Sequence, residues 1–310
     1  MSIRDDILAR LYEGETSGEA LAAQLGVTRA AVWKAIRQLN ADGYTVTSSR
    51  KGYRLDGGDV PSAPGISHYL HSSWNVTAYP EATSTNDIAK ALAEKGADRA
   101  AVVADRQTRG RGRMGRQFIS PPGSGLYMSV VMRPELTAAD CGRITAFAAV
   151  VVARAIERLC GARADIKWVN DVYMNGKKVC GILTEGGFGM ENGRLSYAVT
   201  GIGINVRHAV FPREVAEIAT SIEEASGTAV DRCALAAAVL DGMADMEREV
   251  KSGCFTEEYR RRSCVIGKRV TVNGEYEALA TGIADDCSLE LETDDGRRLR
   301  FSAGEVSLKL

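Results

Sequence analysis

The first 55 residues carry apolar side chains at helical spacing in three short segments. Within each segment they recur every three or four positions, which is the pattern of a helix with one buried face. The three predicted helices cover residues 3–11, 17–25 and 28–40. Ser17 and Thr28 stand at the starts of the second and third helices. A side-chain hydroxyl at this position accepts a hydrogen bond from a free backbone N–H group of the first turn. Because only residues 26–27 separate these helices, the pattern predicts a helix-turn-helix.

Residues 44–47 and 52–55 alternate in polarity and predict a short β-hairpin, or wing, with its tip at residues 48–51. Residues 56–65 then combine Asp, Gly, Pro and Ser without periodicity, which is the composition of a linker. We therefore expect a first domain at residues 1–60 with a winged helix-turn-helix fold.

The rest of the chain mixes apolar runs typical of strands with longer periodic segments typical of helices. Predicted strands lie at residues 76–79, 100–104, 125–132, 166–171, 172–185 (a hairpin) and 197–206. Predicted helices lie at residues 83–95, 139–160, 232–251 and 255–262. Five alternating strand segments follow at residues 269–272, 277–284, 289–293, 299–302 and 306–310. This order predicts an α+β multidomain protein, with a mixed α/β domain at residues 66–262 and a small β domain at residues 263–310.

Overall composition narrows the class of protein. The 310 residues hold 39 Lys and Arg against 40 Asp and Glu, a net charge of −1, so no global charge attracts nucleic acid or a membrane. Seven cysteines without a C-x-x-C pair argue against a disulfide framework or a zinc site. The first residues lack the apolar core of a signal peptide, and the longest apolar run, residues 146–153, is too short to span a bilayer. We expect a cytoplasmic protein with no membrane partner.

Local charge points to DNA. Residues 28–54 hold six basic residues against one acidic residue, a balance of +5, whereas residues 1–27 hold two against five, a balance of −3. One polarised basic face is what contact with DNA phosphates requires. The candidate DNA-binding residues are Thr28, Arg29, Lys34, Arg37, Arg50 and Lys51. The alternative is a winged helix used only for packing.

Residues 110–116, Gly-Arg-Gly-Arg-Met-Gly-Arg, interleave three glycines with three arginines between two predicted strands. We call this segment the Gly-Arg loop. Glycine lets a backbone approach a ligand closely, and arginine matches carboxylate and phosphate oxygens, so the loop suits a small anion. A disordered RG-rich nucleic-acid tail is the alternative, but such tails lack flanking strands. The run also fits G-x-G-x-x-G, yet Pro121 and Pro122 stand where that fingerprint needs a helix, which excludes a dinucleotide site.

Three further segments complete a recognisable set. They are Lys-Trp-Val-Asn-Asp at residues 167–171, Lys-Val-Cys-Gly-Ile-Leu-Thr-Glu at 178–185 and Gly-Ile-Gly-Ile-Asn at 201–205. In this order and spacing, the segments resemble the biotin protein ligase family. With the winged helix in front, the chain is similar to the bifunctional members, which are both biotin ligase and biotin operon repressor, and the resemblance covers essentially the whole chain.

The resemblance implies a biotin/lipoate-ligase-like catalytic domain and an SH3-like C-terminal β-barrel. It implies that ATP and biotin, with Mg²⁺, give biotinyl-5′-AMP. It also implies transfer of biotin to a lysine on the biotin carboxyl-carrier domain of a biotin-dependent carboxylase. Operator DNA and a ligand-promoted homodimer are the other implied partners. The chain has neither a P-loop nor an evident Ser-His-Asp or Cys-His arrangement. Adenylation needs no protein nucleophile, because the substrate carboxylate is itself the nucleophile.

Motif matching gives the candidate site. The implied biotin-binding residues are Ser84, Thr85, Asn86, Gln107, Arg111, Gly112, Arg113 and Lys178. The implied nucleotide-binding residues are Asn170, Asp171 and Asn205. The implied catalytic residues are Arg113, Lys178, Asp171 and Lys167. Two positions depart from the family pattern, since Val169 stands where Pro is frequent and Phe118 where Trp is frequent; neither change removes a charged group.

Two other functions stay open. One is a DNA-binding regulator whose central domain only senses biotin or another small carboxylate. The other is a ligase for a different acyl group, such as lipoate. A pure sensor has no need to keep Arg113, Lys178 and Asp171 together, so their joint presence favours the biotin ligase.

Overall fold

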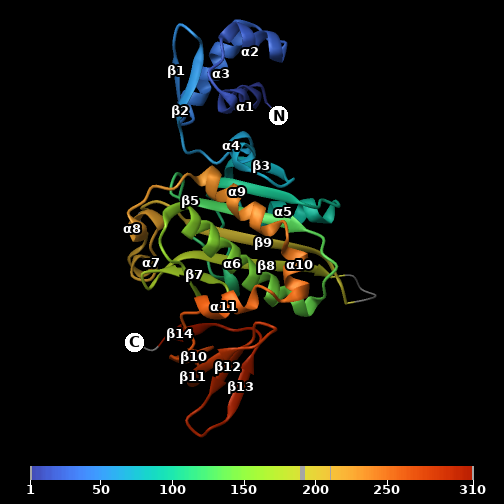
Figure 1. Ribbon diagram of the computed structural model, residues 1–310, viewed down its shortest axis with the longest axis vertical. Coiled ribbons are helices and arrows are strands. Elements are labelled where there is room, and N and C mark those ends of the chain that lie inside the picture. The colour runs from blue at the N-terminus through green and yellow to red at the C-terminus, as the bar shows by residue number, and fades with distance from the viewer. Residues whose placement is uncertain (1, 189–192, 210, 309–310) are drawn as a thin grey trace.

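The computed structural model describes residues 2–188, 193–209 and 211–308. Figure 1 shows three units along the longest axis, with the N-terminal helices at one end, the C-terminal sheet at the other and a larger sheet with its helices between them. The predicted α+β fold class is confirmed. In the described part of the chain, no helix combines the length and apolar composition that crossing a membrane requires.

The N-terminal unit is a winged helix-turn-helix. Its elements are α1 (Ile3–Glu13), α2 (Gly18–Leu25), α3 (Arg29–Ala41), β1 (Thr45–Ser48) and β2 (Tyr53–Gly57). The side chains of Ser17 and Thr28 accept from the N–H groups of Ala20 and Ala31, which confirms both predicted caps. The apolar faces of the helices and of β1 meet in one core, which includes Ile7, Leu8, Leu21, Val32, Ile36 and Val46.

A seven-stranded sheet forms the central unit. Its strands are β3 (Asn75–Ala82), β4 (Ala100–Gln107), β5 (Gly125–Met132), β6 (Asp165–Lys167), β7 (Asp171–Met174), β8 (Lys177–Phe188) and β9 (Leu195–Asn205). The strand order is β3-β4-β5-β9-β8-β7-β6. Only the β3–β4 pair of this described sheet runs parallel. The interior strand β5 is buried along its whole length, as expected for a strand covered on both faces.

Helices cover both faces of this sheet. α6 (Cys141–Cys160), α9 (Arg232–Met243), α10 (Met246–Ser252) and α11 (Thr256–Arg262) contribute to a core that contains Ala101 and Val103 of β4. α5 (Thr85–Glu94) packs against the neighbouring residues Ala100 and Val102. Because successive strand residues point to opposite faces, α5 lies on the face opposite α6.

The C-terminal unit is a five-stranded antiparallel sheet. Its strands are β10 (Arg269–Val272), β11 (Tyr276–Ile283), β12 (Leu289–Glu292), β13 (Arg298–Phe301) and β14 (Val306–Leu308), in the order β13-β12-β11-β10-β14. The last predicted strand extends to residue 310, and residues 309–310 lie outside the described residues. Alternating residues of β11 and β12 join the main core, so this sheet packs on the central unit.

Several elements differ from the predicted ones. The predicted helix 232–251 is two helices, because the N–H of Ala244 is shared between the carbonyls of Leu240 and Asp241, which tightens the turn. The predicted strand 166–171 is interrupted by a turn at residues 168–170. Three short helices lie where none was predicted: α4 (Ala63–Tyr69), α7 (Arg213–Ala216) and α8 (Ile222–Ser226). They are too short to establish a helical period in the sequence.

The segment between the first two units is held by a buried arginine. The side chain of Arg232, at the start of α9, is 2% exposed. Its Nε lies 3.0 Å from Oδ2 of Asp59, and its Nη1 lies 2.6 Å from Oδ1 of Asp105 and 3.0 Å from the carbonyl oxygen of Gly125. The carbonyl of the next residue, Val60, accepts from the Tyr44 hydroxyl of the winged helix at 3.1 Å. Residues 59–60 are therefore fixed to both units, within the stretch whose composition indicates a linker.

Candidate active site

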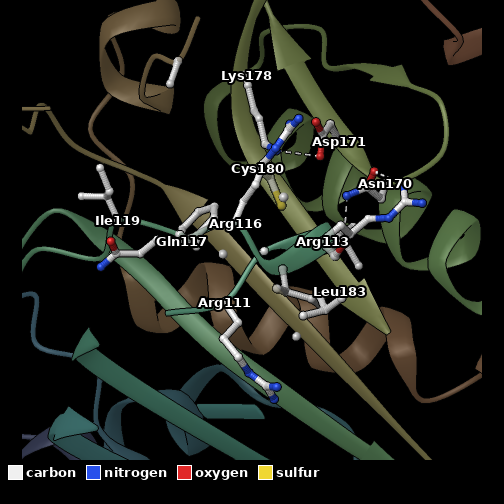
Figure 2. A pocket seen from close by; sticks show the side chains of 18 of the residues that line it. Arg111, Arg113, Arg116, Gln117, Ile119, Asn170, Asp171, Lys178, Cys180 and Leu183 are labelled. Carbon is white, nitrogen blue, oxygen red and sulfur yellow. Dashed lines mark hydrogen bonds and ion pairs between the residues drawn. The ribbon is translucent and has the colours of Figure 1, made fainter. Parts of the chain in front are cut away.

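A cavity of about 310 Å³ lies beside the Gly-Arg loop (Figure 2). All twelve residues that we predicted to bind biotin or nucleotide or to act in catalysis line it. They are Ser84, Thr85, Asn86, Gln107, Arg111, Gly112, Arg113, Lys167, Asn170, Asp171, Lys178 and Asn205. These residues come from α5 and its N-cap, β4, the Gly-Arg loop, β6, the β6–β7 turn, β7, β8 and β9, so the fold brings together segments that are distant in the sequence.

Hydrogen bonds fix the polar residues at the start of α5. The N–H and the hydroxyl of Thr85 donate to Oε1 of Gln107 at 2.8 and 3.1 Å. The hydroxyl of Ser129 lies 2.8 Å from that of Thr85 and 2.6 Å from Oδ1 of Asn86. Ser84 caps the helix, as its sequence position indicates, and it also lines the cavity. Because these groups are buried and hydrogen-bonded, they present a rigid polar surface to a ligand.

Gly201 and Gly203 of β9 allow other groups to approach this strand. A Cβ atom at Gly203 would lie 2.6 Å from the ring of Phe118, and one at Gly201 would overlap the amide of Asn86. The groups that approach these two glycines closely are protein side chains. Phe118 consequently packs against the sheet and forms part of the cavity wall.

The two inner arginines of the Gly-Arg loop have different partners. Nη1 of Arg113 donates to Oδ1 of Asn170 at 3.0 Å, across to the β6–β7 turn. Arg111 instead pairs with Asp87 at 2.6 Å and with Glu185 at 3.0 Å. In Figure 2 the Arg111 side chain points away from the polar groups that surround Arg113.

An ion pair joins β7 and β8 on the other side of the cavity. Nζ of Lys178 lies 2.8 Å from Oδ1 of Asp171. That oxygen is buried and makes no hydrogen bond to any described residue, so the contact is one of charge alone. Nζ of Lys167 is 3.5 Å from the hydroxyl of Tyr173, whose pKa is raised by burial, so this partner stays neutral. Burial likewise raises the pKa of the Cys180 thiol in the cavity wall, which makes it a poor nucleophile.

Sequence reasoning missed two parts of the wall. The first comes from residues 211–219, where Phe211, Val215 and Ile218 line the cavity. Nδ2 of Asn205 donates to the carbonyl of Thr220, the residue that follows this segment, at 3.2 Å. The apolar i,i+3 pair Val215 and Ile218 is the signal that points to it. The second part is residues 304–306 of the C-terminal unit, for which the local sequence gives no signal.

The cavity has a positive balance of charge. Five cationic side chains line it, namely Arg111, Arg113, Arg116, Lys167 and Lys178, against the carboxylates of Asp171 and Glu305. Such a lining suits a ligand with carboxylate or phosphate groups. Within residues 2–188, 193–209 and 211–308, no three His, Cys, Asp or Glu side chains are grouped to hold a metal ion by themselves.

The predicted DNA-binding residues lie on α3, at its N-cap and at the hairpin tip, and all six are exposed. The hydroxyl of Thr28 caps α3, so that group already has a structural role. The guanidinium of Arg37 lies 4.8 Å from the ring centroid of Trp33, a cation–π contact on the same helix. Trp33 is 53% exposed, and sequence reasoning did not single it out.

Three families match successive parts of the chain. Residues 4–54 match the HTH domain, residues 79–205 match the Biotin/lipoate A/B protein ligase family, and residues 265–309 match the Biotin protein ligase C terminal domain. One match falls in each of the three units in Figure 1.

Relatives match along nearly the whole chain. The Bifunctional ligase/repressor BirA of Bacillus subtilis is 36% identical over 302 residues, covering 93% of this chain and 92% of the relative. The protein of the same name from Escherichia coli is 30% identical, covering 98% and 96%. The structure of a biotin protein ligase from Aquifex aeolicus in complex with biotin and ATP is similar with a TM-score of 0.64 and 30% identity, over 76% of this chain and 98% of that chain. The chain therefore belongs to the biotin protein ligase family, among its bifunctional ligase/repressor members.

Proposed function

We propose that this protein is a biotin–[biotin carboxyl-carrier protein] ligase that forms biotinyl-5′-AMP from biotin and ATP and transfers biotin to a carrier-domain lysine. The observation that carries the proposal is the convergence of all twelve predicted residues on one positively lined cavity. The family membership and the Aquifex aeolicus ligase in complex with biotin and ATP support it.

In the first step, a carboxylate oxygen of biotin attacks the α-phosphorus of ATP, and pyrophosphate leaves as its bond to that phosphorus breaks. The rigid polar groups of Ser84, Thr85, Asn86 and Gln107 hold the polar ring end of biotin. Arg113 and Lys178 stabilise the negative charge that develops on the phosphoryl oxygens, which is the main task of such a site. Holding both substrates in one cavity removes much of the entropic barrier.

We assign the nucleotide to the side of the cavity formed by Asn170, Asp171 and Asn205, next to the wall at residues 211–219. In the second step, the neutral amine of the carrier lysine attacks the acyl carbon, an amide bond forms with loss of one amine proton to water, and AMP leaves with the electrons of the broken anhydride bond. Lys167 adds positive charge on the side of the leaving phosphate.

Mg²⁺ is the expected metal ion, and Asp171 fits it. The buried oxygen of this carboxylate has no hydrogen-bond partner in the described part of the chain. Mg²⁺ is commonly held by one or two carboxylates together with substrate phosphates. Asp171 would supply the protein ligand in place of its contact with Lys178. When bound, the ion supplies positive charge that offsets the charge of the phosphates.

The decisive experiment incubates the protein with ATP, Mg²⁺ and biotin and looks for biotinyl-5′-AMP by mass spectrometry. A parallel reaction replaces biotin with lipoate. Biotin bound without adenylate would instead identify a sensor, and lipoyl-adenylate as the preferred product would identify a lipoate ligase. Addition of a biotin carboxyl-carrier domain then tests the transfer step.

We further propose that residues 1–60 carry out biotin-responsive repression of transcription. In this proposal residues 66–262 form the ligase domain, residues 263–310 form the SH3-like domain, and the protein is cytoplasmic. The basic residues of α3 and the hairpin tip support contact with operator DNA. A dimer that binds two symmetric half-sites has a higher operator affinity than a monomer. We expect biotinyl-5′-AMP to promote this homodimer and thereby to tighten operator binding. Sedimentation and gel-shift measurements with and without biotin and ATP test this, and a ligand-independent monomer with unchanged DNA affinity would contradict it.

A further inference from the structure

We propose that Glu305 is a positioning residue for the ligase reaction. It holds the Gly-Arg loop over the cavity through Arg116 and thereby slows the release of biotinyl-5′-AMP. This inference rests on the proposed ligase function and gives the C-terminal unit a defined part in it. Glu305 precedes β14, and Arg116 is the last residue of the Gly-Arg loop.

The contact between these residues has bidentate geometry. Nη1 and Nη2 of Arg116 lie 2.5 and 2.6 Å from Oε1 and Oε2 of Glu305. Isolated surface ion pairs contribute little, but a two-point Arg–carboxylate pair is the stronger exception. It joins residues separated by 189 positions, so it ties the loop to a different unit of the protein.

Glu305 is presented from a fixed backbone. Its N–H donates to Oδ1 of Asn273 at 2.9 Å, and the N–H of Asn273 donates to the Glu305 carbonyl at 2.9 Å. The preceding residue, Gly304, has a φ of +152°, and a Cβ there would lie 2.9 Å from the Asn273 side chain. Residues other than glycine are therefore disfavoured at position 304, and the turn fixes the backbone from which the Glu305 side chain extends.

The C-terminal sheet is itself fixed relative to the cavity. Nε1 of Trp168, a residue in the cavity wall, donates to the carbonyl of Cys287 at 2.8 Å in a buried contact. The β6–β7 turn that starts at Trp168 also contains Asn170, the partner of Arg113. The Gly-Arg loop is thus held at two points, by Arg113 through Asn170 and by Arg116 through Glu305. The β6–β7 turn and the C-terminal sheet that carry these partners are themselves joined through Trp168.

The loop depends on these polar ties because it has no apolar anchor of its own. Its one large apolar side chain, Met114, is 75% exposed. The carbonyl of Arg116 accepts from the N–H of Gly112 at 2.7 Å, so fixing Arg116 also fixes the backbone that lines the cavity. Segments with few buried apolar contacts open easily, and opening here exposes a mixed anhydride to water.

The experiment measures release of preformed biotinyl-5′-AMP from the full chain during a chase with excess unlabelled biotin and ATP, alongside the burst rate of its synthesis. We expect Glu305→Gln and Arg116→Gln each to release the adenylate about fivefold faster, equivalent to about 1 kcal/mol. The burst rate should fall by a smaller factor than release rises, because Arg116 and Glu305 line the cavity but act here through the position of the loop. The matched control is Glu275→Gln, an exposed carboxylate on the β10–β11 turn of the same sheet, which should release at the wild-type rate.

The reversed pair Arg116→Glu with Glu305→Arg separates positioning from general damage, since it restores opposite charges at the same two places. Release within about twofold of wild type supports the proposal. Two results overturn the proposal. One is release at the wild-type rate in both single variants. The other is a reversed pair whose release rate rises by the product of the two single increases. If the wild-type protein forms no adenylate at all, the ligase function fails instead. Thermal unfolding of each variant identifies any loss of fold. Arg116→Lys keeps the positive charge but loses the two-point guanidinium contact, so it should show an intermediate release rate.

Discussion

Replacement of Arg232 by glutamine should destabilise the central unit strongly while leaving the cavity unchanged. This side chain is 2% exposed and is not part of the cavity lining. It contacts the carboxylates of Asp59 and Asp105, whose side chains are 12% and 21% exposed. Removing one partner of a buried ion pair typically costs about 3–5 kcal/mol, because the other charge stays buried without compensation.

The remaining contacts place the expected loss at the lower end of that range. Nη2 of Arg207 lies 2.6 Å from Oδ2 of Asp59, so this carboxylate keeps one cationic partner after the substitution. Asp105 keeps the hydrogen bond from the backbone N–H of Gly123 at 3.2 Å. It loses its arginine partner, and no other arginine pairs with it in the described part of the chain. We therefore expect a loss of about 3 kcal/mol in the free energy of unfolding. In a domain of this size that is a fall of about 6–12 °C in Tm.

Urea and thermal unfolding of the full chain measure the loss, and Arg207→Gln is the matched control. The Arg207 side chain is 38% exposed and leaves the Arg232–Asp59 contact intact, so its removal should cost about 1 kcal/mol or less. Operator affinity should fall in Arg232→Gln, because Asp59 and Val60 then hold the winged helix less firmly, while adenylate synthesis by the folded protein should persist. Equal stability of the two variants, or a loss below about 1 kcal/mol for Arg232→Gln, would refute this reasoning.

Three other predictions follow from the site and the fold. Arg113→Ala and Lys178→Ala should each slow adenylate formation by about 100-fold, or roughly 3 kcal/mol, with little change in Tm; unchanged burst kinetics in both would remove the catalytic assignment. Backbone N–H groups of residues 109–118 should exchange more slowly with biotin and ATP than without, and equal rates would show that the loop does not order on the ligand. Hydrogen bonds from Arg262, which outweigh the opposing effect of burial, lower the pKa of Glu157 below its ordinary 4.5. Its contribution is therefore present above pH 4.5 and lost as pH falls through the lowered pKa. Glu157→Gln should cost about 1–2 kcal/mol at pH 7, and this cost should shrink progressively as the pH falls below 4.5, as urea unfolding at a series of pH values would show.

Sequence alone determined the features that local patterns encode. Helical spacing and hydroxyl caps located α2 and α3, and a mostly apolar run located β5 with its bounds unchanged. Glycine and arginine at high density marked the Gly-Arg loop as a candidate ligand-binding segment, because backbone freedom and planar charged groups are properties of those residues themselves. The family motifs then named a set of residues that the fold brings to one cavity.

Only the tertiary structure decided which distant groups meet. Arg232 appeared in the sequence as an ordinary helix start, yet it is the buried partner of Asp59, 173 positions away. Glu305 appeared as one acid among nine in the C-terminal unit, yet it pairs with the Gly-Arg loop. The composition of residues 56–65 indicated a linker, and the contacts of Asp59 and Val60 hold it against both units. Side-chain type and spacing report on neighbours within a few residues, whereas an ion pair between elements depends on how those elements pack, and packing is set by the whole core at once.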